Sequence, residues 1–160
     1  MSRPKTTPRA VLRAREMIRA PYRHLGRNRQ GIDCLGLMFH ALDLDEAAYG
    51  EVLEAHELAG GYYSGSRWVY DRNDPRIRES CRILLSALTK HLLTCRMDDL
   101  RAGDVLLISF KSGKDGLGDH IGLYAGDGKM IHADLRRGVE EVVIPEKLWR
   151  RVIGVYRKAE

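Results

Sequence analysis

The feature that most constrains this chain is the segment 32–36, Ile-Asp-Cys-Leu-Gly, which is followed by further apolar residues as far as Leu42. Asp33 is a favoured helix N-cap, because its carboxylate accepts hydrogen bonds from the free N–H groups of a first turn. Cys34 would then open the helix, where the helix dipole lowers a thiol pKa from its usual value of about 8.5. We therefore expect a reactive thiolate, typical of a cysteine hydrolase, although a lone cysteine in an apolar helix is more often simply buried.

Two histidines far downstream favour the catalytic interpretation. His120 and His132 lie in short apolar segments on either side of residues 126–128, Gly-Asp-Gly, which indicate a hairpin turn. A three-residue loop there places Gly122 opposite His132, and side-chain alternation puts His120 on the same face. The imidazoles can then touch, with Gly122 leaving room for them, so that one is a base and the other orients it. A two-residue loop would place the histidines on opposite faces.

Four segments match one family in the same order along the chain: residues 21–26, 31–37, 100–105 and 120–133. Together they resemble the NlpC-type cysteine peptidases, papain-like enzymes that cut peptidoglycan stem peptides. The resemblance covers nearly the whole chain apart from residues 43–98. Cys, His and His in this order, with these flanking residues, are far more specific than any single segment.

The resemblance implies a role for each of four side chains. Cys34 is the expected nucleophile, His120 the general base, and His132 the residue that holds and polarises His120. Tyr22 lies where the family has a tyrosine that reaches the active site and positions substrate or stabilises the oxyanion. The resemblance implies no metal ion or other cofactor.

One position departs from the family pattern. Many bacterial members have Ser after the catalytic cysteine, where it helps an Asp receive the free amine of the stem peptide, and here Leu35 replaces it. Asp33 is therefore expected to bind substrate alone. The Asp-Cys-Leu-Gly version resembles phage-encoded cell-wall peptidases and their relatives in gene transfer particles, as do Tyr62, Tyr63 and the segment 149–157. Tyr62 and Tyr63 either face the substrate or pin a loop to the core.

The order of the expected elements predicts an α+β fold in a single domain, residues 1–160, with a helical and loop insertion at 43–98. Helices, including the one that begins at Cys34, come first and pack on a five- to six-stranded antiparallel sheet, as in the papain-like NlpC fold. The other expected helices are 9–19, 46–58 and 76–93, and the expected strands are 104–110, 119–125, 129–134, 138–144 and 151–157.

Charge and cysteine content argue against several other classes. Residues 1–30 hold nine Lys or Arg against one acid, a local charge of +8 (nine minus one), whereas the whole chain carries +5. A solvated helix face explains this better than a nucleic-acid partner, because no stacking aromatics or nucleic-acid motif accompany it. Cys34, Cys81 and Cys95 are odd in number and lack metal-ligand spacing, which argues against a disulfide framework and a zinc site.

The sequence also bears on where the protein is made and where it acts. No stretch approaches the roughly 18 apolar residues of a membrane span, and residues 1–8 lack the apolar core of a signal peptide. We expect synthesis in the cytoplasm, where the thiols stay reduced, and delivery to the cell wall by a phage particle or by lysis.

Three function classes follow from these features. The first is a peptidase that hydrolyses peptidoglycan stem peptides, at the bond between D-Glu and the diamino acid, through an acyl-enzyme on Cys34. The second is an amidase or acyltransferase with the same site. The third is a non-catalytic component that partners phage-tail or particle proteins, against which the intact Cys34, His120 and His132 argue.

Overall fold

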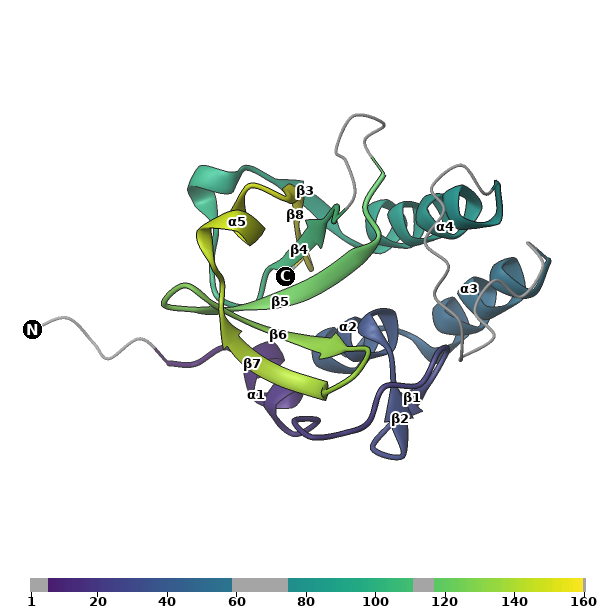
Figure 1. Ribbon diagram of the computed structural model, residues 1–160, viewed down its shortest axis with the longest axis horizontal. Helices are drawn as coiled ribbons and strands as arrows, with labels where there is room; N and C mark the ends of the chain where they lie inside the picture. The colour runs from purple at the N-terminus through teal and green to yellow at the C-terminus, as the bar shows by residue number, and fades with distance from the viewer. Residues whose placement is uncertain (1–5, 59–74, 111–116, 160) are drawn as a thin grey trace, which may run out of the picture.

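The computed structural model describes residues 6–58, 75–110 and 117–159. Six antiparallel strands form one sheet in the spatial order β3-β8-β4-β5-β6-β7 (Figure 1). The strands are β3 (Leu93–Cys95), β4 (Val105–Ile108), β5 (His120–Gly126), β6 (Lys129–Asp134), β7 (Gly138–Val143) and β8 (Val152–Arg157). A second, two-stranded sheet pairs β1 (Arg27–Asn28) with β2 (Gly31–Ile32).

Most helices precede the sheet along the chain, and the predicted α+β fold is confirmed. The helices are α1 (Arg9–Arg15), α2 (Cys34–Leu42), α3 (Glu46–Leu58), α4 (Pro75–His91) and the short α5 (Glu146–Trp149), with a 3-10 turn at Met97–Asp99. The predicted helices 46–58 and 76–93 correspond to α3 and α4. Within the described ranges, no helix has the length and apolar character needed to cross a membrane.

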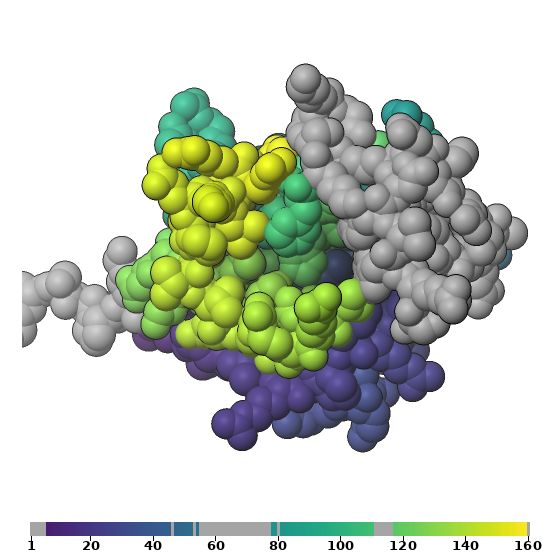
Figure 2. Space-filling view, viewed as in Figure 1, coloured from purple at the N-terminus to yellow at the C-terminus, as the bar shows by residue number. Residues whose placement is uncertain are grey.

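α1 and α2 pack against the sheet, where both contact β5 and β6 (Figure 1). Figure 2 shows the same arrangement from the outside, with the purple N-terminal residues in a layer beneath the yellow-green strands. Val11 and Ala14 of α1 are fully buried in this layer, together with Ile121 and Leu123 of β5. The shared core therefore fixes the start of α2 relative to β5.

α1 is shorter than the predicted helix 9–19 because the chain turns away at Arg19. This residue has a φ of 76°, and its N–H donates to the carbonyl of Val139 on β7 at 2.9 Å. The Val139 N–H donates in return to the carbonyl of Ala20 at 2.9 Å. The chain between α1 and β1 thus covers the outer edge of β7, which would otherwise expose unpaired backbone groups.

α2 begins at Cys34 because the preceding residues satisfy its first turn. Asp33 is the N-cap, as predicted: its Oδ1 accepts a hydrogen bond from the Gly36 N–H at 2.7 Å. Its Oδ2 accepts one from the Leu25 N–H at 2.8 Å. Gly36 packs on the carbonyl of Gly26, where an added Cβ would lie 2.2 Å from the oxygen. A side chain at Gly36 would therefore push α2 away from the chain that caps it.

Asp104, at the end of the segment 100–105, joins two strands of the sheet. Its carboxylate is buried, and Arg157 at the end of β8 donates to it from Nε and from Nη2, each at 2.7 Å. The backbone N–H of Arg101 donates to the same carboxylate at 2.8 Å. Asp104 thus ties the start of β4 to the end of β8.

Several short elements were not predicted. β1 and β2 have two residues each and β3 has three, too few to show an alternating pattern. Cys81 lies in α4 and Cys95 lies in β3. Tyr62 and Tyr63 belong to residues 59–74, outside the described residues, so their contact with substrate stays a prediction.

Candidate active site

Cys34 is half-buried at the N-terminus of α2. Its thiol is within hydrogen-bond reach of the backbone N–H of Ile121, on β5. This N–H and those of Leu35 and Cys34 each act to lower the thiol pKa. Ile121 directly follows His120 in the sequence. The cysteine and the first histidine therefore belong to the same contact between α2 and β5.

The turn between β5 and β6 differs from the prediction. Gly126 pairs with Lys129, so the loop has two residues, Asp127 and Gly128, rather than three. Both loop residues have positive φ, 53° and 73°, as a type I′ hairpin turn requires. The predicted three-residue loop is therefore wrong.

A β-bulge nevertheless restores the predicted strand register. Ala125 is an extra residue on β5, where the pairing with β6 shifts by one position. Beyond this bulge Leu123 pairs with Ile131, which is the register that the three-residue loop would have produced. Because the bulge compensates for the shorter loop, His120 and His132 still lie on the same face of the hairpin.

The expectation that Gly122 leaves room for the two imidazoles is wrong. An added Cβ at Gly122 would lie 2.8 Å from Sδ of Met130, and Met130 supplies all three of its nearest contacts. The space at Gly122 is therefore taken by Met130, whose side chain comes from the facing strand β6.

A chain of hydrogen bonds connects three strands at the site. His120 Nε2 lies 2.8 Å from His132 Nδ1, with the two rings nearly perpendicular at 84°. His132 is buried, and its Nε2 lies 2.9 Å from Oε1 of Glu140 on β7. The predicted contact between His120 and His132 is confirmed, and the chain continues one residue further than predicted.

Glu140 is absent from the site residues that the sequence suggested. It pairs directly with His132 across the ladder between β6 and β7. Arg137 holds both of its carboxylate oxygens, with Nε 2.9 Å from Oε2 and Nη2 2.8 Å from Oε1. The signal was present in the sequence, because pairing Asp134 with Gly138 across the turn places Glu140 opposite His132.

Burial decides the protonation state of the resting site. Burial, and next the negative charge of Asp33, raises the pKa of the Cys34 thiol to about 12. Burial, and next the proximity of His132, lowers the pKa of His120 to about 3. Both groups are therefore neutral near pH 7. The expected lowering of the thiol pKa is wrong for the resting site, because loss of hydration outweighs the helix N-terminus.

Asp33 stabilises the start of α2. Burial raises its pKa to about 6, although hydrogen bonds from the N–H groups of Gly36 and Leu25 act in the opposite direction. His24 Nδ1 lies 3.9 Å from its Oδ2. The carboxylate thus supports the helix start, and its contact with a substrate amine stays a prediction.

Two aromatic residues lie near the ends of the site. Tyr22 bridges to Ile32, close to the start of α2, and is partly buried against the core. Its predicted contact with substrate or oxyanion is not tested by this position. Phe110 was not predicted: it is 47% exposed, and its ring centroid lies 5.5 Å from that of His120.

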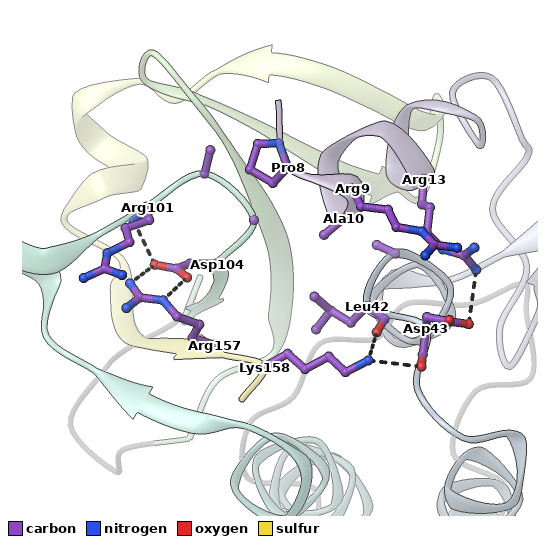
Figure 3. A pocket seen from close by; sticks show the side chains of 13 residues that line it. Pro8, Arg9, Ala10, Arg13, Leu42, Asp43, Arg101, Asp104, Arg157 and Lys158 are labelled. Atoms are coloured by element: carbon purple, nitrogen blue, oxygen red, sulfur yellow. Dashed lines mark hydrogen bonds and ion pairs between the residues drawn. The ribbon is translucent and has the colours of Figure 1, made fainter. Parts of the chain in front are cut away.

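A cavity of about 400 Å³ lies at the opposite end of α2 from Cys34 (Figure 3). Its charged walls pair with one another: Lys158 Nζ donates to the carbonyl of Leu42 at 2.7 Å, and Arg13 lies 3.6 Å from Asp43. The cavity therefore lies at the C-terminus of α2 and is separate from the candidate site. Among the residues that the structure describes, no group of three or more His, Cys, Asp or Glu could hold a metal ion.

Known proteins resemble this chain in both sequence and fold. A gamma-D-glutamyl-L-lysine dipeptidyl-peptidase of Bacillus subtilis (strain 168) is 32% identical over 63 residues, which are 39% of this chain and 21% of the relative. The chain thus spans about a fifth of that relative's length.

Solved structures share the fold. An NlpC/P60 family protein from Bacillus cereus ATCC 10987 matches with a TM-score of 0.60 and 19% identity, over 97% of this chain and 42% of that one. The NlpC/p60 domain of the peptidoglycan hydrolase SagA matches with a TM-score of 0.53 and 19% identity, over 92% and 95% respectively. The model of the NlpC/P60 family matches residues 19–157. Because this match covers most of the chain, the protein belongs to the NlpC/P60 family.

Proposed function

We propose that this protein is a cysteine peptidase that hydrolyses peptidoglycan stem peptides at the bond between D-Glu and the diamino acid. The observation that carries the proposal is the 2.8 Å contact between His120 and His132. His120 lies on β5, the strand that packs beside the helix of Cys34. Family membership and the similarity to a peptidase named for gamma-D-glutamyl-L-lysine support the substrate class.

In the proposed mechanism, His120 Nδ1 takes the thiol proton while Sγ of Cys34 attacks the carbonyl carbon of the scissile bond. Proton transfer and attack occur together, because both groups are neutral at rest. Backbone N–H groups at the start of α2 stabilise the oxyanion. His120 then gives its proton to the leaving amine and a thioester remains on Cys34. Water, deprotonated by His120, hydrolyses this thioester and restores the thiol.

Substrate recognition is proposed for a second group of residues. Leu35 offers no hydroxyl, so Asp33 is the group proposed to receive the free amine of the stem peptide. Tyr22 is proposed to position substrate or to stabilise the oxyanion, and Tyr62 and Tyr63 to face the stem peptide.

Digestion of purified peptidoglycan, with the fragments identified by mass spectrometry, tests this function. The proposal expects fragments that end in D-Glu and others that begin with the free amine of the diamino acid. Cys34→Ala serves as the matched inactive control. Cleavage before the stem peptide would instead identify an amidase, and products joined to an added amine would identify an acyltransferase.

Two further proposals concern the setting. The Asp-Cys-Leu-Gly sequence around Cys34 supports a phage-related enzyme, made in the cytoplasm and delivered by a particle or by lysis. Intact peptidoglycan after prolonged incubation with folded protein would favour a non-catalytic particle component. Co-purification with particles would test the proposed association with phage-tail or particle proteins.

A further inference from the structure

We infer that Glu140 is a positioning residue whose carboxylate fixes the tautomers of both histidines and leaves Nδ1 of His120 unprotonated. The catalytic consequence of this inference rests on the proposed function, since Nδ1 of His120 is the nitrogen that would serve Cys34. The tautomer pattern itself is a property of the folded chain and can be measured without substrate.

The first step concerns the bond between Glu140 and His132. Arg137 donates to both oxygens of Glu140, and this interaction holds the pKa of the carboxyl below its usual range. An ionised carboxylate can only accept hydrogen bonds. The 2.9 Å contact between Oε1 of Glu140 and Nε2 of His132 therefore requires the proton to be on Nε2.

The second step carries this constraint to His120. A neutral imidazole with its proton on Nε2 has a lone pair on Nδ1, so His132 Nδ1 must accept. The group 2.8 Å away is His120 Nε2, which must then donate. Burial lowers the pKa of His120 to about 3 and keeps it neutral, so its remaining nitrogen, Nδ1, carries no proton.

Arg137 has a separate part in this chain. The groups that face His132 are His120 on β5, Glu140 on β7 and, in electrostatic range, Asp134 on β6. Unbalanced carboxylate charge would favour a doubly protonated His132, whose Nδ1–H would donate to His120 and reverse the chain. Arg137, bound through both nitrogens to Glu140 and 3.6 Å from Asp134, offsets that charge.

Two substitutions at Glu140 distinguish the loss of the hydrogen-bond acceptor from a change in side-chain size. Glu140→Met keeps the length and removes the acceptor. Glu140→Gln keeps an oxygen at the Oε1 position, because both His132 and Arg137 donate there. Glu141→Met is the matched control: Glu141 is the next residue on β7, its side chain points to the other face, and its partner is Arg15 at 2.7 Å.

The experiment is long-range ¹H–¹⁵N NMR of histidine-labelled protein near neutral pH, which distinguishes a protonated ring nitrogen from an unprotonated one. In the unsubstituted protein, His120 and His132 should each carry the proton on Nε2 alone. Glu140→Gln and Glu141→Met should keep this pattern, and Glu140→Met should lose it at both rings. A proton on Nδ1 of either ring in the unsubstituted protein would overturn the inference, whatever the stability of the variants.

Kinetics provide the second measurement. Glu140→Met should lower kcat by about tenfold or more with KM changed less than about twofold, as expected for loss of an orienting group. Glu140→Gln should recover most of the loss. Equal kcat in Glu140→Met and Glu141→Met would contradict a positioning role. If the unsubstituted protein does not cut peptidoglycan, the proposed function fails while the tautomer measurement still decides the inference.

Discussion

Asp104 and Glu140 are each held by an arginine through two hydrogen bonds, yet the two networks differ. Asp104 receives Arg157 at 2.7 Å from two nitrogens, and Glu140 receives Arg137 at 2.9 and 2.8 Å. The difference lies in the next partner. Asp104 accepts a backbone N–H, from Arg101, whereas Glu140 contacts the imidazole of His132.

This difference distinguishes a network that supports the fold from one that reaches the candidate active site. The network at Asp104 closes on the backbone and joins β4 to β8, so every proton in it stays where it is. The network at Glu140 ends in His120, the residue that is proposed to exchange a proton with Cys34. An acid held by an arginine is therefore no sign of catalysis by itself, and the chemistry depends on which group contacts the remaining acceptor.

The largest effect is expected at the nucleophile. Cys34→Ala should abolish hydrolysis of peptidoglycan while leaving the fold intact, because a small side chain at the helix start leaves the Asp33 cap in place. Cys81→Ala and Cys95→Ala are the matched controls and should keep turnover. Residual turnover by Cys34→Ala close to that of the unsubstituted enzyme would rule out the mechanism.

The next effect is expected at His132. His132→Ala should lower kcat by about 10²–10⁴-fold, the usual contribution of general acid–base catalysis, with substrate binding little changed. His132→Gln can still accept a hydrogen bond from His120 and should recover part of the loss. Steady-state kinetics of both variants check this, and a loss confined to KM would show that His132 contacts substrate instead.

The thiol should respond to pH in the direction set by burial. A pKa raised to about 12 keeps Cys34 protonated through neutral pH, and half of the thiol is ionised only near that pKa. The rate of alkylation is measured against pH in a Cys81→Ala, Cys95→Ala background. It should rise at a higher pH in the folded protein than in the same protein in denaturant. A midpoint pH below that of the denatured protein would instead support the lowered thiol pKa that the helix start predicts.

A smaller effect, on stability alone, is expected at Asp104. Asp104→Ala leaves the Nε–H of Arg157 and the N–H of Arg101 without their acceptor, although Arg157 keeps its bonds to Asp99. The substitution should lower the free energy of unfolding by about 3 kcal/mol. Urea denaturation measures the loss, and kcat of the folded fraction should be unchanged. A matching fall in kcat would mean that the two networks are coupled.

Local patterns predicted the helix at Cys34, since its cap and its apolar run are close in the sequence. They also predicted that His120 and His132 meet, although the loop length was wrong and a bulge at Ala125 corrected the register. Glu140 was missed because its role depends on pairing across a third strand. The raised pKa of Cys34 was missed because burial results from packing between α2 and β5, which no local pattern contains.

The most direct test of the polar chain is a double-mutant cycle on kcat between Glu140→Met and His132→Ala. If Glu140 acts only through His132, Glu140→Met should lower kcat by about tenfold or more in the unsubstituted enzyme and by less than about twofold when His132 is already alanine. Equal factors in both backgrounds would contradict this and would place Glu140 with Asp104, as a residue that supports the fold alone.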